Sequence, residues 1–447
     1  MKWLKRTLIA LALLLVVALA LPFLISLEGY RPELEKAASE RLGEPVTIAA
    51  IRLAALPTPH VSIEGIKAGS DAKLERITVT PQLTSLWQPV KVISDIELDG
   101  LTLTRQALTK LPSWAQPKSA EPPKVQVRIA ALHLTDARLE LGDATLGPLD
   151  GELTLDDTGA PQAATLATQD GKLKAEVGFG QQDYPLDIHA HDWTLPAGPA
   201  LKFDALDIKG AATRSALKFT ALDAKLYGGT VGGKVALDWS RGWQLDGALD
   251  IRALELHPLV ALFSPNQHVS GRLMAHPTFS AAAPQADKLA AAIRLQTPFS
   301  VSNGVLHGVD IEQAATHLVK QGMSGGETRF DTLSGQLEMA QGGYRFTQLK
   351  VASGALAVDG AVDISARREL SGRITAQVGI LGANASVPLN VSGTLDQPML
   401  LPTGAALTGA AVGTALLGPG MGTAVGVKVG GWVENLFGGS KEKPTKK

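Results

Sequence analysis

The sequence of 447 residues contains no cysteine, which excludes disulfide bonds and thiolate metal ligands and is compatible with an oxidising compartment such as the bacterial periplasm. Aromatic residues make up only 5% of the chain although hydrophobic residues make up 45%, so the apolar side chains are mostly aliphatic. The formal net charge is −1, so the basic surface that nucleic-acid binding requires is lacking. The 46 glycines and 26 prolines favour many short strands joined by turns.

One long stretch without charge stands near the start of the chain. Residues 8–27 are almost all Leu, Ala, Val, Ile or Phe, and a run of about 20 such residues is long enough to cross a bilayer as a helix. Lys2, Lys5 and Arg6 precede the run, and no cation follows it before Arg31. The positive-inside bias therefore predicts a cytoplasmic N-terminus and places the rest of the chain across the membrane.

Two interpretations of this run are open. The ALA sequence at 18–20 resembles a cleavage site and is compatible with a cleaved signal peptide. The run is longer than such a peptide needs, which favours an uncleaved transmembrane anchor over residues 1–27. The residues predicted to face the membrane are Leu8, Leu14, Val17, Phe23 and Leu27.

After the anchor, the periodicity of the sequence changes twice. Residues 29–42 have the spacing of an amphipathic helix, and Gly43 is a suitable end for it. From Val46 onward the hydrophobic period is two, which predicts on the order of 25 to 30 strands. Only residues 255–263 and 309–319 interrupt this pattern with helical spacing.

So few helices leave the apolar faces of the strands uncovered. Large exposed apolar surfaces are rare in proteins and usually functional, so either two sheets pack together as a sandwich or one sheet curls into a trough that meets an apolar ligand. An aliphatic lining with few aromatic residues suits acyl chains. The residues predicted to line such a groove are Val125, Val127, Ile129, Leu173, Val177 and Phe179.

The last part of the chain is rich in glycine and alanine. Residues 404–437 contain several GxxxG steps, which allow two helices to approach closely. A helical hairpin on a membrane or at the end of a sheet is one interpretation, and low-complexity disorder is the other.

The motifs that resemble catalytic or ligand sites lack the required context. GMSGG at 322–326 fits the nucleophile elbow of serine hydrolases, but no histidine follows Ser324. GGTVGGKV at 228–235 resembles a phosphate-binding loop, but a strand pattern follows it in place of a helix. His189 and His191 share one side of a strand, and a metal site needs at least three convergent ligands. We therefore expect no enzyme activity, no cofactor and no metal site.

Several stretches, taken in order, resemble the AsmA-like family of Gram-negative envelope proteins, relatives of the TamB-type bridge proteins. The anchor and polar helix are followed by a strand, a Pro-Thr-Pro turn at 57–59 and a second strand. IELDG at 96–100 resembles a recurring strand end of the family, and LYGG at 226–229 resembles a strand turn. FSVSNGVLHGVD at 299–310, residues 330–365 and NVSGTLDQP at 390–398 resemble its C-terminal repeat and closing strand. The glycine- and alanine-rich tail departs from the family pattern.

The resemblance implies a mostly β fold, in which an N-terminal transmembrane helix precedes an elongated, curled antiparallel β-sheet with an apolar groove and a few short helices. The expected segments are an anchor (1–27), a helix with strands (28–111), a proline-rich linker (112–124), a β-groove (125–400) and the tail (401–447).

The resemblance also implies a function. The protein would be anchored in the inner membrane with its bulk in the periplasm, and would bind phospholipid and help move it between inner and outer membrane. The alternative is a scaffold or assembly factor that binds outer-membrane proteins by strand addition at an exposed sheet edge. Neither function involves nucleic acid.

Overall fold

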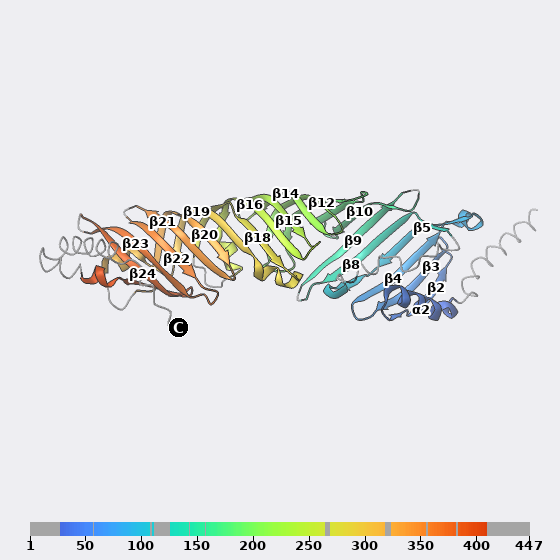
Figure 1. The fold of residues 1–447 in the computed structure, drawn as a ribbon. Coiled ribbons are helices and arrows are strands. Elements are labelled where there is room, and N and C mark those ends of the chain that lie inside the picture. The colour runs from blue at the N-terminus through green and yellow to red at the C-terminus, as the bar shows by residue number, and fades with distance from the viewer. Residues whose placement is uncertain are drawn as a thin grey trace, which may run out of the picture. The chain divides into compact units, whose positions relative to one another are not determined.

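The computed structural model describes residues 27–56, 58–107, 110, 126–142, 144–156, 158–263, 269–317, 323–354, 356–380 and 383–408. These residues form 25 strands and few helices, so the mostly β fold class is confirmed. The chain divides into two compact units, residues 1–200 (unit 1) and residues 201–447 (unit 2). Each unit is described by itself below (Figure 1).

The strands of unit 1 all pair within one sheet. They are β1 (Val46–Thr47), β2 (Ala50–Ala54), β3 (His60–Ala68), β4 (Ala72–Pro81), β5 (Val90–Asp99), β6 (Thr102–Thr104), β7 (Gln126–Ile129), β8 (Ala131–Glu140), β9 (Thr145–Leu155), β10 (Pro161–Thr168), β11 (Leu173–Gly178) and β12 (Tyr184–Thr194). Strands β1 and β2 both pair with β3, and the ladder continues through β4 and β5 to β8 and then in chain order to β12.

The prediction of an antiparallel sheet is wrong at one place in unit 1. Strands β5 and β6 pair in parallel with β7 and β8, so the sheet is mixed. A tight hairpin reverses the direction of the chain and makes neighbouring strands antiparallel. The long connection between β6 and β7 instead returns the chain to the end of the sheet where β5 begins, so β7 and β8 run in the same direction as β5. Ala130 interrupts the strand between β7 and β8.

A helix follows the first described residue. A single 3-10 turn, η1 (Glu28–Tyr30), leads into α2 (Arg31–Leu42), which ends at Gly43 with a left-handed φ of 77°. The helix predicted at residues 29–42 is therefore confirmed, including its glycine stop, since glycine has no Cβ to oppose this conformation. Ala38 and Leu42 pack against Val46, Ala68 and Ala72, so α2 lies along the first strands of unit 1 (Figure 1).

Unit 2 contains the remaining strands in one ladder. They are β13 (Lys202–Ala212), β14 (Ala216–Leu226), β15 (Gly229–Asp238), β16 (Trp243–Glu255), β17 (Val269–Ala275), β18 (Thr278–Ala283), β19 (Arg294–His307), β20 (Glu327–Ala340), β21 (Gly343–Ser353), β22 (Leu356–Ile364), β23 (Leu370–Ile380), β24 (Ala383–Thr394) and β25 (Gln397–Pro402). Besides η1, three short 3-10 turns connect strands: η2 (Leu83–Trp87), η3 (Ala286–Lys288) and η4 (Ala290–Ala292).

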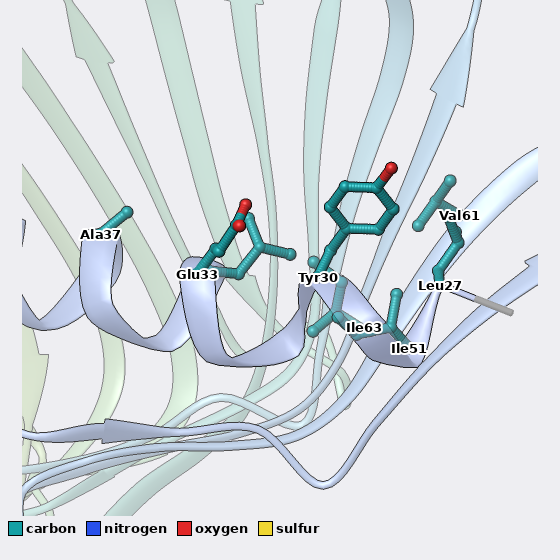
Figure 2. A pocket seen from close by; sticks show the side chains of 8 residues that line it. Leu27, Tyr30, Glu33, Ala37, Ile51, Val61 and Ile63 are labelled. Carbon is teal, nitrogen blue, oxygen red and sulfur yellow. The ribbon is translucent and has the colours of Figure 1, made fainter.

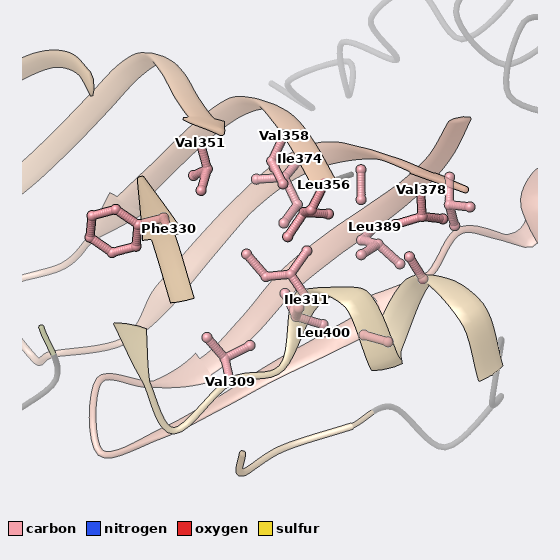
Figure 3. Packing of buried hydrophobic residues seen from close by; sticks show 14 of the residues in the cluster. Val309, Ile311, Phe330, Val351, Leu356, Val358, Ile374, Val378, Leu389 and Leu400 are labelled. Atoms are coloured by element: carbon pink, nitrogen blue, oxygen red, sulfur yellow. The ribbon is translucent and has the colours of Figure 1, made fainter. Parts of the chain in front are cut away.

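Both predicted helices of unit 2 are confirmed, as α4 (Leu256–Ala261) and α5 (Ile311–His317). Helix α5 covers the apolar face of the last strands: Ala314 and Ala315 are fully buried in one cluster with Val387 and Leu389. Figure 3 shows Ile311 and Leu400 among the strand residues of this cluster. The segment 404–408 is also helical, and its Ala406 is fully buried in the same cluster.

Within the described residues, no helix is long and apolar enough to cross a membrane. The predicted anchor lies outside them except for Leu27, so Leu8, Leu14, Val17 and Phe23 are not placed. The GxxxG steps of the tail lie outside them as well.

Candidate functional site

The sheet of unit 1 has one continuous apolar face. Residues that lie directly opposite each other on neighbouring strands point to the same side of a sheet, and so do residues two apart on one strand. Row one, which crosses nine strands, consists of Leu53, Val61, Val79, Ile96, Leu132, Leu153, Ala164, Val177 and Leu186. Row two, two residues away on each strand, consists of Ile51, Ile63, Ile77, Leu98, Leu134, Gly151, Leu166, Ala175 and Ile188.

The residues between these two rows point to the other side of the sheet, and all of them are polar. They are Arg52, Ser62, Thr78, Glu97, His133, Glu152, Thr165, Glu176 and Asp187. Ion pairs lie along this polar row, such as that between Arg52 and Glu64 and the His133 Nδ1 contact of 2.8 Å to Asp95. The sheet is therefore amphipathic across nine strands, with a polar face and an aliphatic face.

The aliphatic face is not filled by a second layer. Every residue of row one is half-buried, and in row two only Ile51 is fully buried. In the cluster of unit 2, by contrast, Val387 and Leu389 have no exposed surface because α5 covers them. Outside the part that α2 covers, the described residues of unit 1 leave this apolar face only half-buried, which is the arrangement that the trough interpretation predicts.

The structure brings most of the predicted groove residues to this face. Val177 belongs to row one, Leu173 lies on the same side of β11, and Ile129 lies on the same side as Ile93 beside it. Val127 and Phe179 lie at the ends of their strands and are more exposed, with Phe179 in an edge-to-face contact with Tyr184 at a ring distance of 5.8 Å. Val125 lies outside the described residues.

A pocket of about 460 Å³ lies where α2 meets the apolar face. It is lined by Leu27, Tyr30, Glu33, Leu34, Ala37, Ile51, Val61 and Ile63. Figure 2 shows Leu27 and Tyr30 on the helical side facing Ile51, Val61 and Ile63 of the sheet. Because Ile51 and Ile63 begin row two and Val61 belongs to row one, the pocket is continuous with the apolar face.

A charged cluster lies beside the C-terminal end of α2, at the opposite end of the helix from Leu27 and Tyr30. Lys110 Nζ lies 2.6 Å from Asp71 Oδ2 and also pairs with Glu44. The hydrogen bond from Lys110, and after it that from Ser70, lowers the pKa of the Asp71 carboxyl below its ordinary value. The same bond to Asp71, and then the bond to Glu44, raises the pKa of Lys110. The periodicity of the sequence carries no signal for this cluster.

The backbone edge of β1 and β2 is covered by side chains of the preceding helix. The N–H of Val46 donates to Ser39 Oγ at 2.8 Å, and that of Ile48 donates to Glu35 Oε1 at 2.7 Å. The N–H of Ile51 donates to Glu28 Oε1 at 3.2 Å. The helical spacing of the sequence at 29–42 does not predict this role.

The motifs that resemble catalytic sites are parts of the β fold. Tyr227 and Gly228, both with positive φ, form the turn between β14 and β15, so the sequence at 228–235 is a strand that follows a turn. Ser324 is exposed and lies in the segment before β20, where Gly325 donates a backbone hydrogen bond to Gly308. His189 lies 2.9 Å from Asp187, and the described part of the chain holds no group of three or more metal-ligand side chains.

The fold is thus that of a mostly β protein, and the mixed sheet of its unit 1 has one aliphatic and one polar face. The chain belongs to the AsmA family, whose model matches residues 1–175 and 181–349. The family prediction is thus confirmed, although the matched region ends before the sequence at 390–398 and the tail. Neither a curated protein nor a solved structure matches the chain.

Proposed function

We propose that this protein binds the acyl chains of phospholipid on the apolar face of unit 1 and helps to move lipid between the inner and outer membranes of a Gram-negative envelope. The observation that carries the proposal is the pair of aliphatic rows, half-buried across nine strands and backed by a polar row. In this account residues 1–27 anchor the protein in the inner membrane, the N-terminus is cytoplasmic, and the bulk of the chain is periplasmic.

The energetics favour this use of the face. Full removal of an acyl chain from water gains about 0.8 kcal/mol for each CH₂, and an apolar face that covers one side of the chain gains part of this free energy. Nine strands spaced about 4.8 Å apart give rows of roughly 40 Å, whereas one acyl chain spans roughly 15 Å, half of a bilayer core. The rows are therefore long enough for more than one chain, and a charged headgroup can remain in water at the open side.

The alternative, strand addition to an outer-membrane protein, is less well supported. Strand addition needs free backbone N–H and C=O groups at a sheet edge. At β1 and β2 these donors are bound by Ser39, Glu35 and Glu28. At β25, Leu400 exchanges two backbone hydrogen bonds with Met323, at 2.9 and 3.0 Å.

Lipid that co-purifies with the protein tests the proposal. We expect mass spectrometry of the gently extracted full chain to find bound phospholipid, and Val177→Asn to reduce its amount severalfold because an amide would then lie in row one. Lys174→Asn places the same amide on the polar side of the same strand and should leave the amount unchanged. Absence of lipid, or equal loss in both variants, would contradict the proposal.

A further inference from the structure

The two ends of the strands in unit 1 differ in character. One end, here named the apolar rim, is where β2 and β4 end and where β5 and β7 begin. Seven large hydrophobic side chains of unit 1 are exposed among the described residues, and two of them, Tyr30 and Leu34, belong to the helical segment. The other five are all at the apolar rim: Leu56 (67% exposed), Leu83 (46%), Trp87 (84%), Val127 (55%) and Phe179 (37%).

The part of the apolar rim nearest α2 carries no charge. The two rim connections nearest α2, residues 55–59 (ALPTP) and 82–89 (QLTSLWQP), contain no charged residue. At the opposite rim, the connections 69–71, 141–144 and 169–172 each contain an aspartate. The described residues of these three connections include no exposed large hydrophobic side chain. The uncharged composition is confined to the part of the apolar rim nearest α2, because the connections 156–160 and 179–183 farther along the same rim contain Asp156, Asp157 and Asp183. The alternation of the strands does not require this difference.

The chain also enters unit 1 at this rim. Leu27, the first described residue, lines the pocket with Val61, which lies at the start of β3 on the apolar rim. The other end of α2 reaches the opposite rim, where Leu42 packs near Ala68 and Ala72. Leu27 is also the last residue of the uncharged run at 8–27, so the described end of that run lies at the apolar rim.

We propose that the apolar rim of unit 1 docks on the surface of a lipid bilayer, with Trp87 and Leu83 inserted at the interface. Tryptophan is favoured at the boundary between headgroups and acyl chains, and an uncharged loop with exposed aliphatic residues loses little solvation there. The ends of β2 and β4 and the starts of β5 and β7 then meet the membrane, and row one lies nearer to it than row two. Movement of lipid from the bilayer across this rim onto the apolar face rests on the proposed function, whereas the docking itself does not.

The absence of cysteine allows a direct test in the full chain. Single cysteines placed by Trp87→Cys and Val127→Cys label the apolar rim, and Glu140→Cys and Gln169→Cys label the opposite rim at exposed positions. Each variant carries a fluorescent label and is reconstituted into vesicles of phosphatidylethanolamine and phosphatidylglycerol that contain nitroxide-labelled lipid. We expect quenching severalfold stronger at residues 87 and 127 than at residues 140 and 169.

Equal quenching at the two rims, or none at either, would overturn the docking proposal. Disulfide-linked dimers of the unlabelled Trp87→Cys or Val127→Cys variant would also overturn it, because they would assign the rim to a second copy of the chain. A second variant, Leu83→Ser combined with Val127→Cys, should weaken quenching at residue 127 without unfolding, since Leu83 is exposed. Rim quenching without lipid on the apolar face would leave the docking intact and contradict lipid transport, so the two proposals fail separately.

Discussion

Ile96 on β5 and Leu132 on β8 lie directly beside each other in a parallel pair, and this contact joins the apolar faces of the strands before and after the β6–β7 crossover. A polar group here would interrupt row one at its middle.

The first prediction concerns this junction. Ligands that bind only the folded state raise its unfolding temperature, so phospholipid added to the delipidated protein should raise the unfolding midpoint. Leu132→Asn should abolish most of that increase. Thr165→Asn, on the polar row, should retain it, and an increase of the same size in both variants would contradict the assignment of the face.

The second prediction concerns the covered edge of β1 and β2. Replacing both Glu35 and Ser39 by alanine removes the acceptors of the Ile48 and Val46 amides. We expect a loss of about 1 kcal/mol for each hydrogen bond and increased self-association, because uncovered edge strands pair with other chains. Light scattering and urea unfolding measure the two effects. The neighbouring Lys36→Ala should change neither, and a monomeric double variant of unchanged stability would refute the capping role.

The third prediction is a pH dependence at the Lys110 cluster. The folded-state pKa of Asp71 is lowered, so its pairing stabilises the fold above the unfolded pKa of about 3.9, and this stabilisation is lost as the pH falls through the folded value. Lys110→Met should therefore lower the unfolding temperature near neutral pH, and the difference from the natural protein should shrink below about pH 4. Lys174→Met removes an exposed pair with Glu176 and should have a smaller effect. A difference that is the same at both pH values would exclude the ion pair as its cause.

The fourth prediction concerns the packing of α5 against the last strands of unit 2. Ala315 is fully buried against the last strands, so Ala315→Leu overpacks this contact and should cost about 1–3 kcal/mol. Gln313→Leu adds a leucine to the exposed side of the same helix and should cost little. Chemical unfolding of both variants measures the difference, and equal stabilities would mean that α5 does not pack as described.

The sequence predicts much of the fold because alternation is a local property. Val177 follows Leu173 by four positions, an even step, so the pattern alone places them on one side of a strand. Helix α2 and its stop at Gly43 are equally local. None of these features requires knowledge of which strands are neighbours.

The features that sequence reasoning missed depend on contacts between distant residues. The parallel junction follows from a crossover whose path no local pattern specifies, and Ile96 meets Leu132 only because of it. Glu35 caps an amide 13 residues away, and Lys110 pairs with Asp71 39 residues away. The apolar rim is visible in part, because QLTSLWQP at 82–89 is uncharged, but its meaning depends on which strand ends lie together.

The most direct test of the central claim compares two adjacent residues on opposite faces of one strand. A photoactivatable amino acid is placed at Ile96, in row one, or at Glu97, in the polar row, and the full chain is irradiated in native membranes. We predict phospholipid adducts from residue 96 and few or none from residue 97. Adducts of equal yield at both positions, or none at residue 96, would contradict a lipid-binding apolar face.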